Sequence, residues 1–107
     1  MKTLKFRPNL VELILSGKKN VTWRLFDDKN LTVGDELEFV NKGTMEKFAN
    51  AVIVGIREKR LGDIGGSDFE GHESYESRDD MFKEMAKNYG DKITGDTLVK
   101  IVEFKLS

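Results

Sequence analysis

Two periodicities meet in the stretch Ser16-Gly17-Lys18-Lys19-Asn20-Val21-Thr22-Trp23-Arg24. Before it, apolar residues recur at helical spacing from Leu10 to Leu15, and Gly17 suits the left-handed position that often ends a helix. After it the period is two, which is typical of a strand: Val21, Trp23 and Leu25 alternate with Asn20, Thr22 and Arg24. The stretch therefore predicts a helix, a turn with two lysines, and a strand with one polar and one apolar face.

Outward from this joint, the chain reads mainly as short strands. Period-two patterns predict strands over residues 2–7, 20–25, 36–39, 48–56 and 97–106. The run 48–56 is nearly all apolar, so we expect it in the centre of the sheet, with a bulge at Gly55. One helix is expected from Pro8 to Gly17, and another from a cap at Ser74 or Ser77 to Gly90. Residues 61–74 form a loop of a length that is more often functional than idle.

The length and the order of these elements indicate one small domain. A chain of 107 residues is long enough for one hydrophobic core and too short for two, so we expect a single domain over residues 1–107. The order strand, helix, several strands, helix, strand predicts a mixed α/β, mainly β, fold. A small β-barrel with two to three α-helices fits this order best.

The composition excludes several functional classes. The absence of cysteine rules out disulfide-linked partners, thiolate catalysis and cysteine-based zinc sites, and it fits a cytoplasmic protein. One histidine, His72, is too few for a histidine-rich metal site. Eighteen basic residues against nineteen acidic ones give a net charge of -1, which argues against a non-specific nucleic-acid coat. The sequence has no apolar run long enough to span a membrane, and its first residues lack the apolar core of a signal peptide.

The polar residues of the joint form a candidate site. Thr22 and Arg24 share one face of their predicted strand, and Lys19 lies in the turn just before it. A lysine that is removed from water can lose its proton and activate a neighbouring hydroxyl as a nucleophile. An arginine nearby suits a phosphate or a carbonyl group. The alternative interpretation is a solvated strand face that carries lysine and arginine without any further role.

The joint resembles the G-x-K-x-x-x-x-R signature of the ASCH domain, a family of β-barrels related to the RNA-binding PUA domain. Three further segments resemble that family. They are the Gly34-Asp35 turn before a strand, the acidic loop over residues 70–76, and the closing strand around residues 101–104. The resemblance spans essentially the whole chain and implies a small PUA-like barrel.

The resemblance implies two kinds of activity. Some small ASCH proteins are amidohydrolases that remove the acetyl group from N4-acetylcytidine by means of a lysine, a threonine and a glutamate, without a metal or other cofactor. The matching catalytic residues are Lys19, Thr22 and Glu70. Other members are linked to RNA binding or RNA cleavage. The expected ligand is therefore a small nucleoside or RNA, the sequence specifies no oligomeric state, and no membrane partner is implied.

The remaining residues of the implied site come from the same two segments. Gly17, Lys18, Arg24 and His72 are expected to bind the substrate, with His72 in place of an aromatic residue that is usual in the family. The position of the glutamate has three alternatives: the loop pattern favours Glu70, counting back from the closing strand favours Glu76, and Glu73 lies between them. A binding module that uses the same pocket without catalysis is the alternative function. Ribonuclease activity is a weaker alternative, because the chain has a single histidine to serve as general acid or base.

Overall fold

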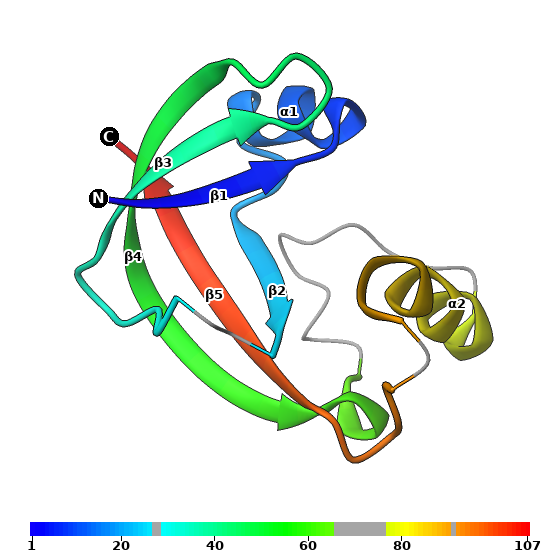
Figure 1. Ribbon diagram of the computed structural model, residues 1–107. Helices are drawn as coiled ribbons and strands as arrows, with labels where there is room; N and C mark the ends of the chain where they lie inside the picture. The colour runs from blue at the N-terminus through cyan, green and yellow to red at the C-terminus, as the bar shows by residue number, and fades with distance from the viewer. Residues whose placement is uncertain (27–28, 66–76, 91) are drawn as a thin grey trace.

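A computed structural model describes residues 1–26, 29–65, 77–90 and 92–107 (Figure 1). The described elements follow the predicted order of strand, helix, several strands, helix and strand. In chain order they are β1 (Lys2–Phe6), α1 (Pro8–Leu15), β2 (Val21–Leu25), β3 (Glu36–Asn41), β4 (Lys47–Arg60), a 3-10 turn (Leu61–Asp63), α2 (Arg78–Tyr89) and β5 (Leu98–Leu106). Each predicted strand is present. Beyond the apolar run 48–56, the charged residues 57–60 carry the strand outward as expected, so that β4 ends at Arg60.

The five strands form one curved sheet in the order β1-β3-β4-β5-β2. The predicted central strand, β4, is indeed in the middle of the sheet. β1 pairs with β3 in parallel, whereas the pairs β3–β4, β4–β5 and β2–β5 are antiparallel. β1 and β2 are the two edges of this sheet, and the strong curvature of β4 and β5 makes it a half-barrel (Figure 1). The mainly-β fold with two helices agrees with the small PUA-like barrel that the sequence implies.

The interior of the half-barrel is a hydrophobic core. Its buried members come from every strand except β2, and from α1 and the segment before β3: Leu4, Phe6, Ile14, Leu31, Leu37, Phe39, Ala51, Ile53, Val102 and Phe104. Phe39 lies at the centre, with ring-centroid distances of 4.8 Å to Phe6 and 4.9 Å to Phe104. α1 covers one end of this core through Ile14, and Leu31 contributes from the segment that leads into β3.

A bulge in β4 keeps this core continuous. The pairing with β5 shifts between Ile53 and Gly55, which leaves Val54 as the extra residue. Without it, Ile53 and Ile56 would face opposite sides of the sheet, because side chains alternate along a strand. With the bulge, Ile53 is buried in the interior core and Ile56 packs against it. The bulge predicted at Gly55 is therefore confirmed and has a packing role.

A second core lies on the outer face of β2 and β5, beneath α2. Val21, Trp23 and Leu25 are buried here together with Val99 and Ile101, as Figure 1 indicates from the position of α2 beside β2. α2 contributes Met81 and Met85. Ser77 caps this helix, since its hydroxyl accepts a hydrogen bond from the Asp80 amide at 3.1 Å. Of the two predicted caps, Ser77 is thus confirmed, and Ser74 lies outside the described residues.

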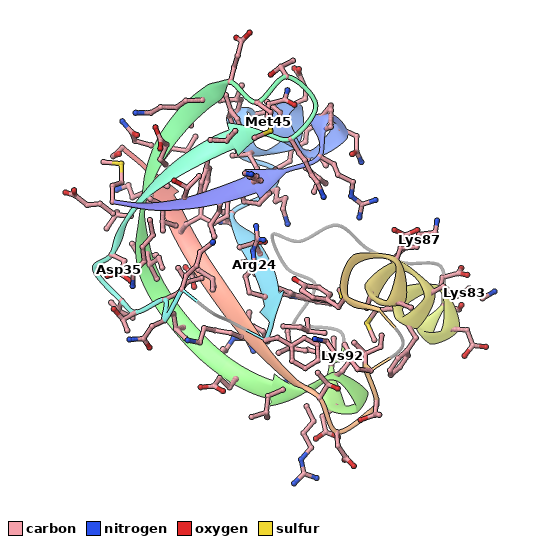
Figure 2. The ribbon with its side chains drawn as sticks, in the orientation of Figure 1. Arg24, Asp35, Met45, Lys83, Lys87 and Lys92 are labelled. Atoms are coloured by element: carbon pink, nitrogen blue, oxygen red, sulfur yellow. The ribbon has the colours of Figure 1, made fainter. Side chains whose placement is uncertain are left out.

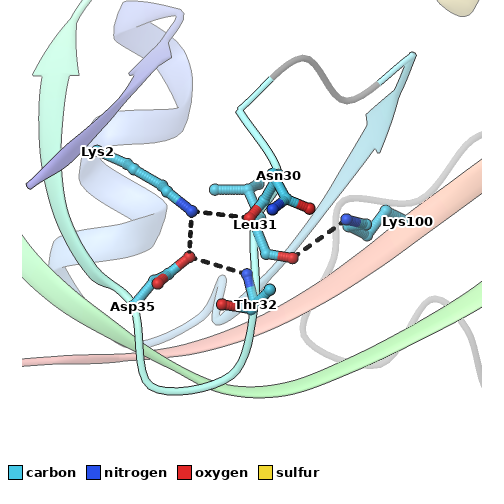
Figure 3. Close-up of polar contacts among 6 residues, drawn as sticks. All are labelled: Lys2, Asn30, Leu31, Thr32, Asp35 and Lys100. Atoms are coloured by element: carbon cyan, nitrogen blue, oxygen red, sulfur yellow. Dashed lines mark hydrogen bonds and ion pairs between the residues drawn. The ribbon is translucent and has the colours of Figure 1, made fainter.

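The segment before β3 is tied across the end of the half-barrel that lies away from α1. Lys2 Nζ donates to the Asn30 carbonyl and to Asp35 Oδ2, and Lys100 Nζ donates to the Leu31 carbonyl at 3.1 Å (Figure 3). β1 and β5 thus both hold this segment. In the described part of the chain, neither helix is long and apolar enough to cross a membrane.

Candidate functional site

The turn between α1 and β2 is fixed by backbone geometry and hydrogen bonds. Gly17 has a φ of 83°, the left-handed conformation that glycine adopts without steric cost, and its amide donates to the Ile14 carbonyl. The Lys19 amide donates to the Leu13 carbonyl at 3.0 Å, so the chain folds back over the end of α1. Gly17 therefore ends the helix as predicted, and the turn directs the next side chains toward the sheet.

Lys19 is buried at the start of β2. Its side chain is only 2% exposed, and Nζ donates to the Val21 carbonyl at 2.7 Å. The Asn20 carbonyl already accepts a hydrogen bond from the Phe104 amide of β5. Because successive carbonyls of a strand point to opposite edges, the Val21 carbonyl faces the edge of β2 that turns away from β5. The amine of Lys19 is thus located on the edge of β2 that faces away from β5, shielded from water.

Thr22 directly follows this carbonyl in the chain. The carbonyl that Lys19 binds belongs to the peptide bond between Val21 and Thr22. Thr22 is 5% exposed, and it pairs with Val102 of the interior core, so its side chain faces the concave side of the half-barrel. Among the described residues, Lys19 and Thr22 are the two polar side chains that are buried. The predicted separation of Thr22 from Trp23 onto opposite faces is therefore confirmed.

Arg24 connects the two edges of the half-barrel. It lies two residues beyond Thr22 on the same face of β2, and its Nη2 donates to the Lys5 carbonyl of β1 at 3.3 Å. Its guanidinium also lies 5.3 Å from the centre of the Phe6 ring. Figure 2 shows Arg24 beside β2, on the side of the sheet that β1 borders. The guanidinium therefore bridges the gap between β1 and β2 and adds positive charge to the concave side.

A groove of about 360 Å³ begins at Arg24 and follows the concave face away from Thr22. Arg24, Lys100 and Glu58 lie side by side in its wall, because Arg24 pairs with Lys100 and Lys100 pairs with Glu58 across three neighbouring strands. The other lining residues are Phe26, Thr97 and Leu98. We call this feature the Arg24–Lys100 groove.

Phe26 lines the groove and has an unusual backbone conformation. Its φ is 51°, which costs a residue with a bulky side chain about 1 to 3 kcal/mol. Its ring is 48% exposed, meets the Tyr89 ring edge-on at 6.1 Å and lies 4.5 Å from Lys92 Nζ. The fold thus keeps an aromatic ring at the surface of a charged groove.

The other predicted site residues have different positions. Lys18 is exposed in the turn, next to Gly17. Glu70 and His72, as well as the alternatives Glu73 and Glu76, lie outside the described residues. Within residues 1–26, 29–65, 77–90 and 92–107, no three acidic or histidine side chains gather in a way that could hold a metal ion.

Sequence reasoning missed Phe26, Glu58 and Lys100 as residues of a groove. Glu58 and Lys100 become neighbours only through the register of β4 and β5, which period-two patterns do not reveal. Phe26 follows the alternating strand over residues 20–25, and nothing in the sequence indicates that a phenylalanine takes up a left-handed conformation there. The sequence did indicate this face of the sheet, because Thr22 and Arg24 alternate with the apolar residues of their strand.

Comparison with solved structures identifies the fold. Half-barrels of this kind, with helices at one end and on one side, define a class of small mainly-β domains. The hypothetical protein PH0355 has this fold with a TM-score of 0.74 at 22% identity, and the match covers 100% of both chains. The ASCH domain from Lactobacillus crispatus JV V101 matches with a TM-score of 0.68 at 15% identity, over 92% of this chain and 70% of that one.

An ASCH protein from Zymomonas mobilis matches with a TM-score of 0.69 at 12% identity, over 96% of this chain and 65% of that one. No protein-family model and no curated protein matches the sequence. The chain therefore has the fold of an ASCH domain, in agreement with the resemblance of its sequence. At these identities the likeness establishes the fold, and the chemistry has to be argued from the residues of the site.

Proposed function

We propose that this protein is an amidohydrolase that removes an acyl group from an N4-acylated cytidine-type nucleoside. The observation that carries the proposal is the burial of both Lys19 and Thr22 at the start of β2, where the Lys19 amine donates to the carbonyl that precedes Thr22. Burying an amine and a hydroxyl costs free energy unless hydrogen bonds compensate for the lost contacts with water. Lys19 and Thr22, which the resemblance implies as catalytic residues, are the two buried polar side chains among the described residues.

The Val21 carbonyl suits Lys19 to the role of a base. An uncharged amine keeps two N–H donors and one lone pair, so Nζ can donate to this carbonyl and still accept a proton. The low exposure of Lys19 favours the uncharged form, because burial disfavours a charge. Lys19 would then take the proton of the Thr22 hydroxyl, as in other sites where a lysine activates a weak nucleophile.

The reaction would proceed in two halves. In the first, Thr22 Oγ1 attacks the acyl carbonyl, the bond from the carbonyl carbon to N4 breaks, and N4 receives a proton, so that the free nucleoside leaves and an ester remains on Thr22. In the second, water attacks the ester, and the carboxylic acid and the free hydroxyl are released. The resemblance assigns proton transfer to Glu70. Arg24 supplies positive charge beside the oxyanion that forms in each half.

The alternative is a module that binds RNA or a modified nucleotide in the same place without turnover. The positive charge of Arg24 and Lys100 on the concave face supports binding of an anionic ligand. The buried Lys19 and Thr22 support the enzyme instead, because binding alone needs no nucleophile. The experiment below separates the two functions, because the binding module predicts no turnover.

The test is the conversion of N4-acetylcytidine to cytidine, followed by chromatography. Lys19→Met keeps most of the side-chain volume and removes the amine, so we expect a rate about 10²- to 10⁴-fold lower than that of the wild type. Lys105→Met, which changes an exposed lysine of β5, is the matched control and should keep the wild-type rate. Thermal unfolding of each variant verifies that it is folded.

Two results would contradict the proposal. Full activity of a folded Lys19→Met variant would exclude Lys19 as the base. No turnover by a folded wild type, with either N4-acetylcytidine or its N4-propionyl analogue, would favour the binding module.

A further inference from the structure

The Arg24–Lys100 groove begins where the proposed reaction site ends. Thr22 and Arg24 are two residues apart on the same face of β2, so their positions along the strand differ by about 7 Å. The same step separates Val102 from Lys100 on β5 and Ile56 from Glu58 on β4. The groove is therefore a direct continuation of the concave surface that carries the Thr22 hydroxyl.

The charged and aromatic lining of this groove suits a phosphate and a further base. Among the described residues, its wall has two cations, Arg24 and Lys100, and one carboxylate, Glu58. Lys92 adds another positive charge near the Phe26 ring. Positive charge next to an exposed aromatic ring is the combination that binds the phosphate and the base of single-stranded nucleic acids.

The contacts of the groove wall make it a preformed surface. Lys100 is held by the Leu31 carbonyl, and Arg24 by the Lys5 carbonyl and the Phe6 ring. Tyr89 of α2 supports the edge of the Phe26 ring. A ligand that enters the groove thus meets charges and a ring already in position, which lowers the entropic cost of binding.

We propose that the Arg24–Lys100 groove binds the nucleotide adjacent to the acylated cytidine, so that the preferred substrate is an oligonucleotide. Arg24 and Lys100 attract the connecting phosphate, and the adjacent base stacks on Phe26. The acylated cytidine in this assignment rests on the proposed function. Binding of a nucleotide to the groove can be tested without any turnover.

The first experiment compares substrates of different length. The probes are N4-acetylcytidine and two dinucleotides, with adenosine linked to the 3′ or to the 5′ side of N4-acetylcytidine. Stacking of one base is worth about 1 to 3 kcal/mol, which corresponds to a roughly 5- to 150-fold higher kcat/KM for one of the dinucleotides. The readout is the ratio of kcat/KM for each dinucleotide to that for the nucleoside.

Two variants of Phe26 test whether a preference for a dinucleotide arises from the groove. Phe26→Leu removes the ring and keeps an apolar side chain, so the ratio should fall close to one. Phe26→Tyr keeps the ring and should retain most of the preference. A wild-type ratio close to one for both dinucleotides, or a ratio that Phe26→Leu leaves unchanged, would overturn the proposal.

A binding measurement separates this proposal from the proposed function. If the wild type hydrolyses none of the probes, the amidohydrolase proposal fails, and fluorescence anisotropy with a labelled tetranucleotide of alternating adenosine and cytidine then tests the groove. Binding that Phe26→Leu weakens at least 5-fold, and that Phe26→Tyr preserves, would keep the groove as a nucleotide site. Equal binding by all three proteins, or no binding, would reject it.

Discussion

At the scale of single residues, the candidate site depends on which polar groups the fold removes from water. The resemblance to ASCH amidohydrolases implies Lys19 and Thr22 as catalytic residues, and both are buried in the structure. Their burial could not be predicted, because a lysine in a turn and a threonine on a strand are usually solvated. It results from the fold-back at Gly17 and from the interior core beneath Thr22.

A second polar group, the carboxylate of Asp35, makes stability depend on pH. The hydrogen bond from Lys2, together with that from the Thr32 amide, lowers the pKa of Asp35 below its ordinary value (Figure 3). A carboxylate with a lowered pKa in the folded state stabilises the protein above the pKa of the unfolded chain. This contribution is lost as the pH falls through the pKa of the folded state.

We therefore expect Asp35→Asn to reduce the dependence of the unfolding free energy on pH between about pH 5 and pH 3. Urea unfolding at several pH values measures this dependence. Lys2→Met removes the hydrogen bond that contributes most to the lowered pKa of Asp35, so it should also reduce the pH dependence. The double variant should differ little from either single variant. An unchanged pH dependence in Asp35→Asn would contradict the assignment.

At the scale of elements, the two faces of β2 belong to different cores. Thr22 faces the interior of the half-barrel, and Trp23 packs under α2 on the outside. The period-two pattern predicted this division. It did not predict the parallel pairing of β1 with β3, since residues distant in sequence form that pair and no local pattern encodes it.

The outer core predicts a large effect for Met81 and a small one for its neighbour Lys83. Met81 is buried against β2 and β5, so Met81→Ala should lower the free energy of unfolding by about 2 to 5 kcal/mol. Lys83 points away from the sheet on the same helix (Figure 2), and Lys83→Ala should change it by about 0.5 kcal/mol or less. Urea unfolding followed by Trp23 fluorescence measures both. Equal effects of the two variants would mean that α2 does not pack on the sheet in this way.

At the scale of the whole molecule, β1 and β2 are the two edges of the sheet in the described part of the chain, and we call the space between these edges the seam. The ladder of hydrogen bonds stops at these two edges in the described part of the chain, and Arg24 spans the seam from β2 to the Lys5 carbonyl. The Lys19 amine lies on the same edge of β2. The proposed reaction site thus lies at the seam, where no strand pairing among the described residues joins β1 to β2.

The sequence indicated this architecture through its pattern of strands and its resemblance to ASCH domains. It could not reveal the seam or the groove, because both depend on curvature and on register across β2, β5 and β4. The same limit explains why Thr22 and Arg24 were identified from their strand, whereas Lys100 and Glu58 were not.

The central claim is that Thr22 is the nucleophile, and hydrolysis of N4-acetylcytidine by two Thr22 variants tests it most directly. Thr22→Val keeps the shape of the side chain and removes the hydroxyl, so turnover should fall by about 10³-fold or more. Thr22→Ser keeps a hydroxyl at the same position and should retain measurable turnover. Wild-type turnover by a folded Thr22→Val variant would contradict the account, because no acyl group could then have passed through Thr22.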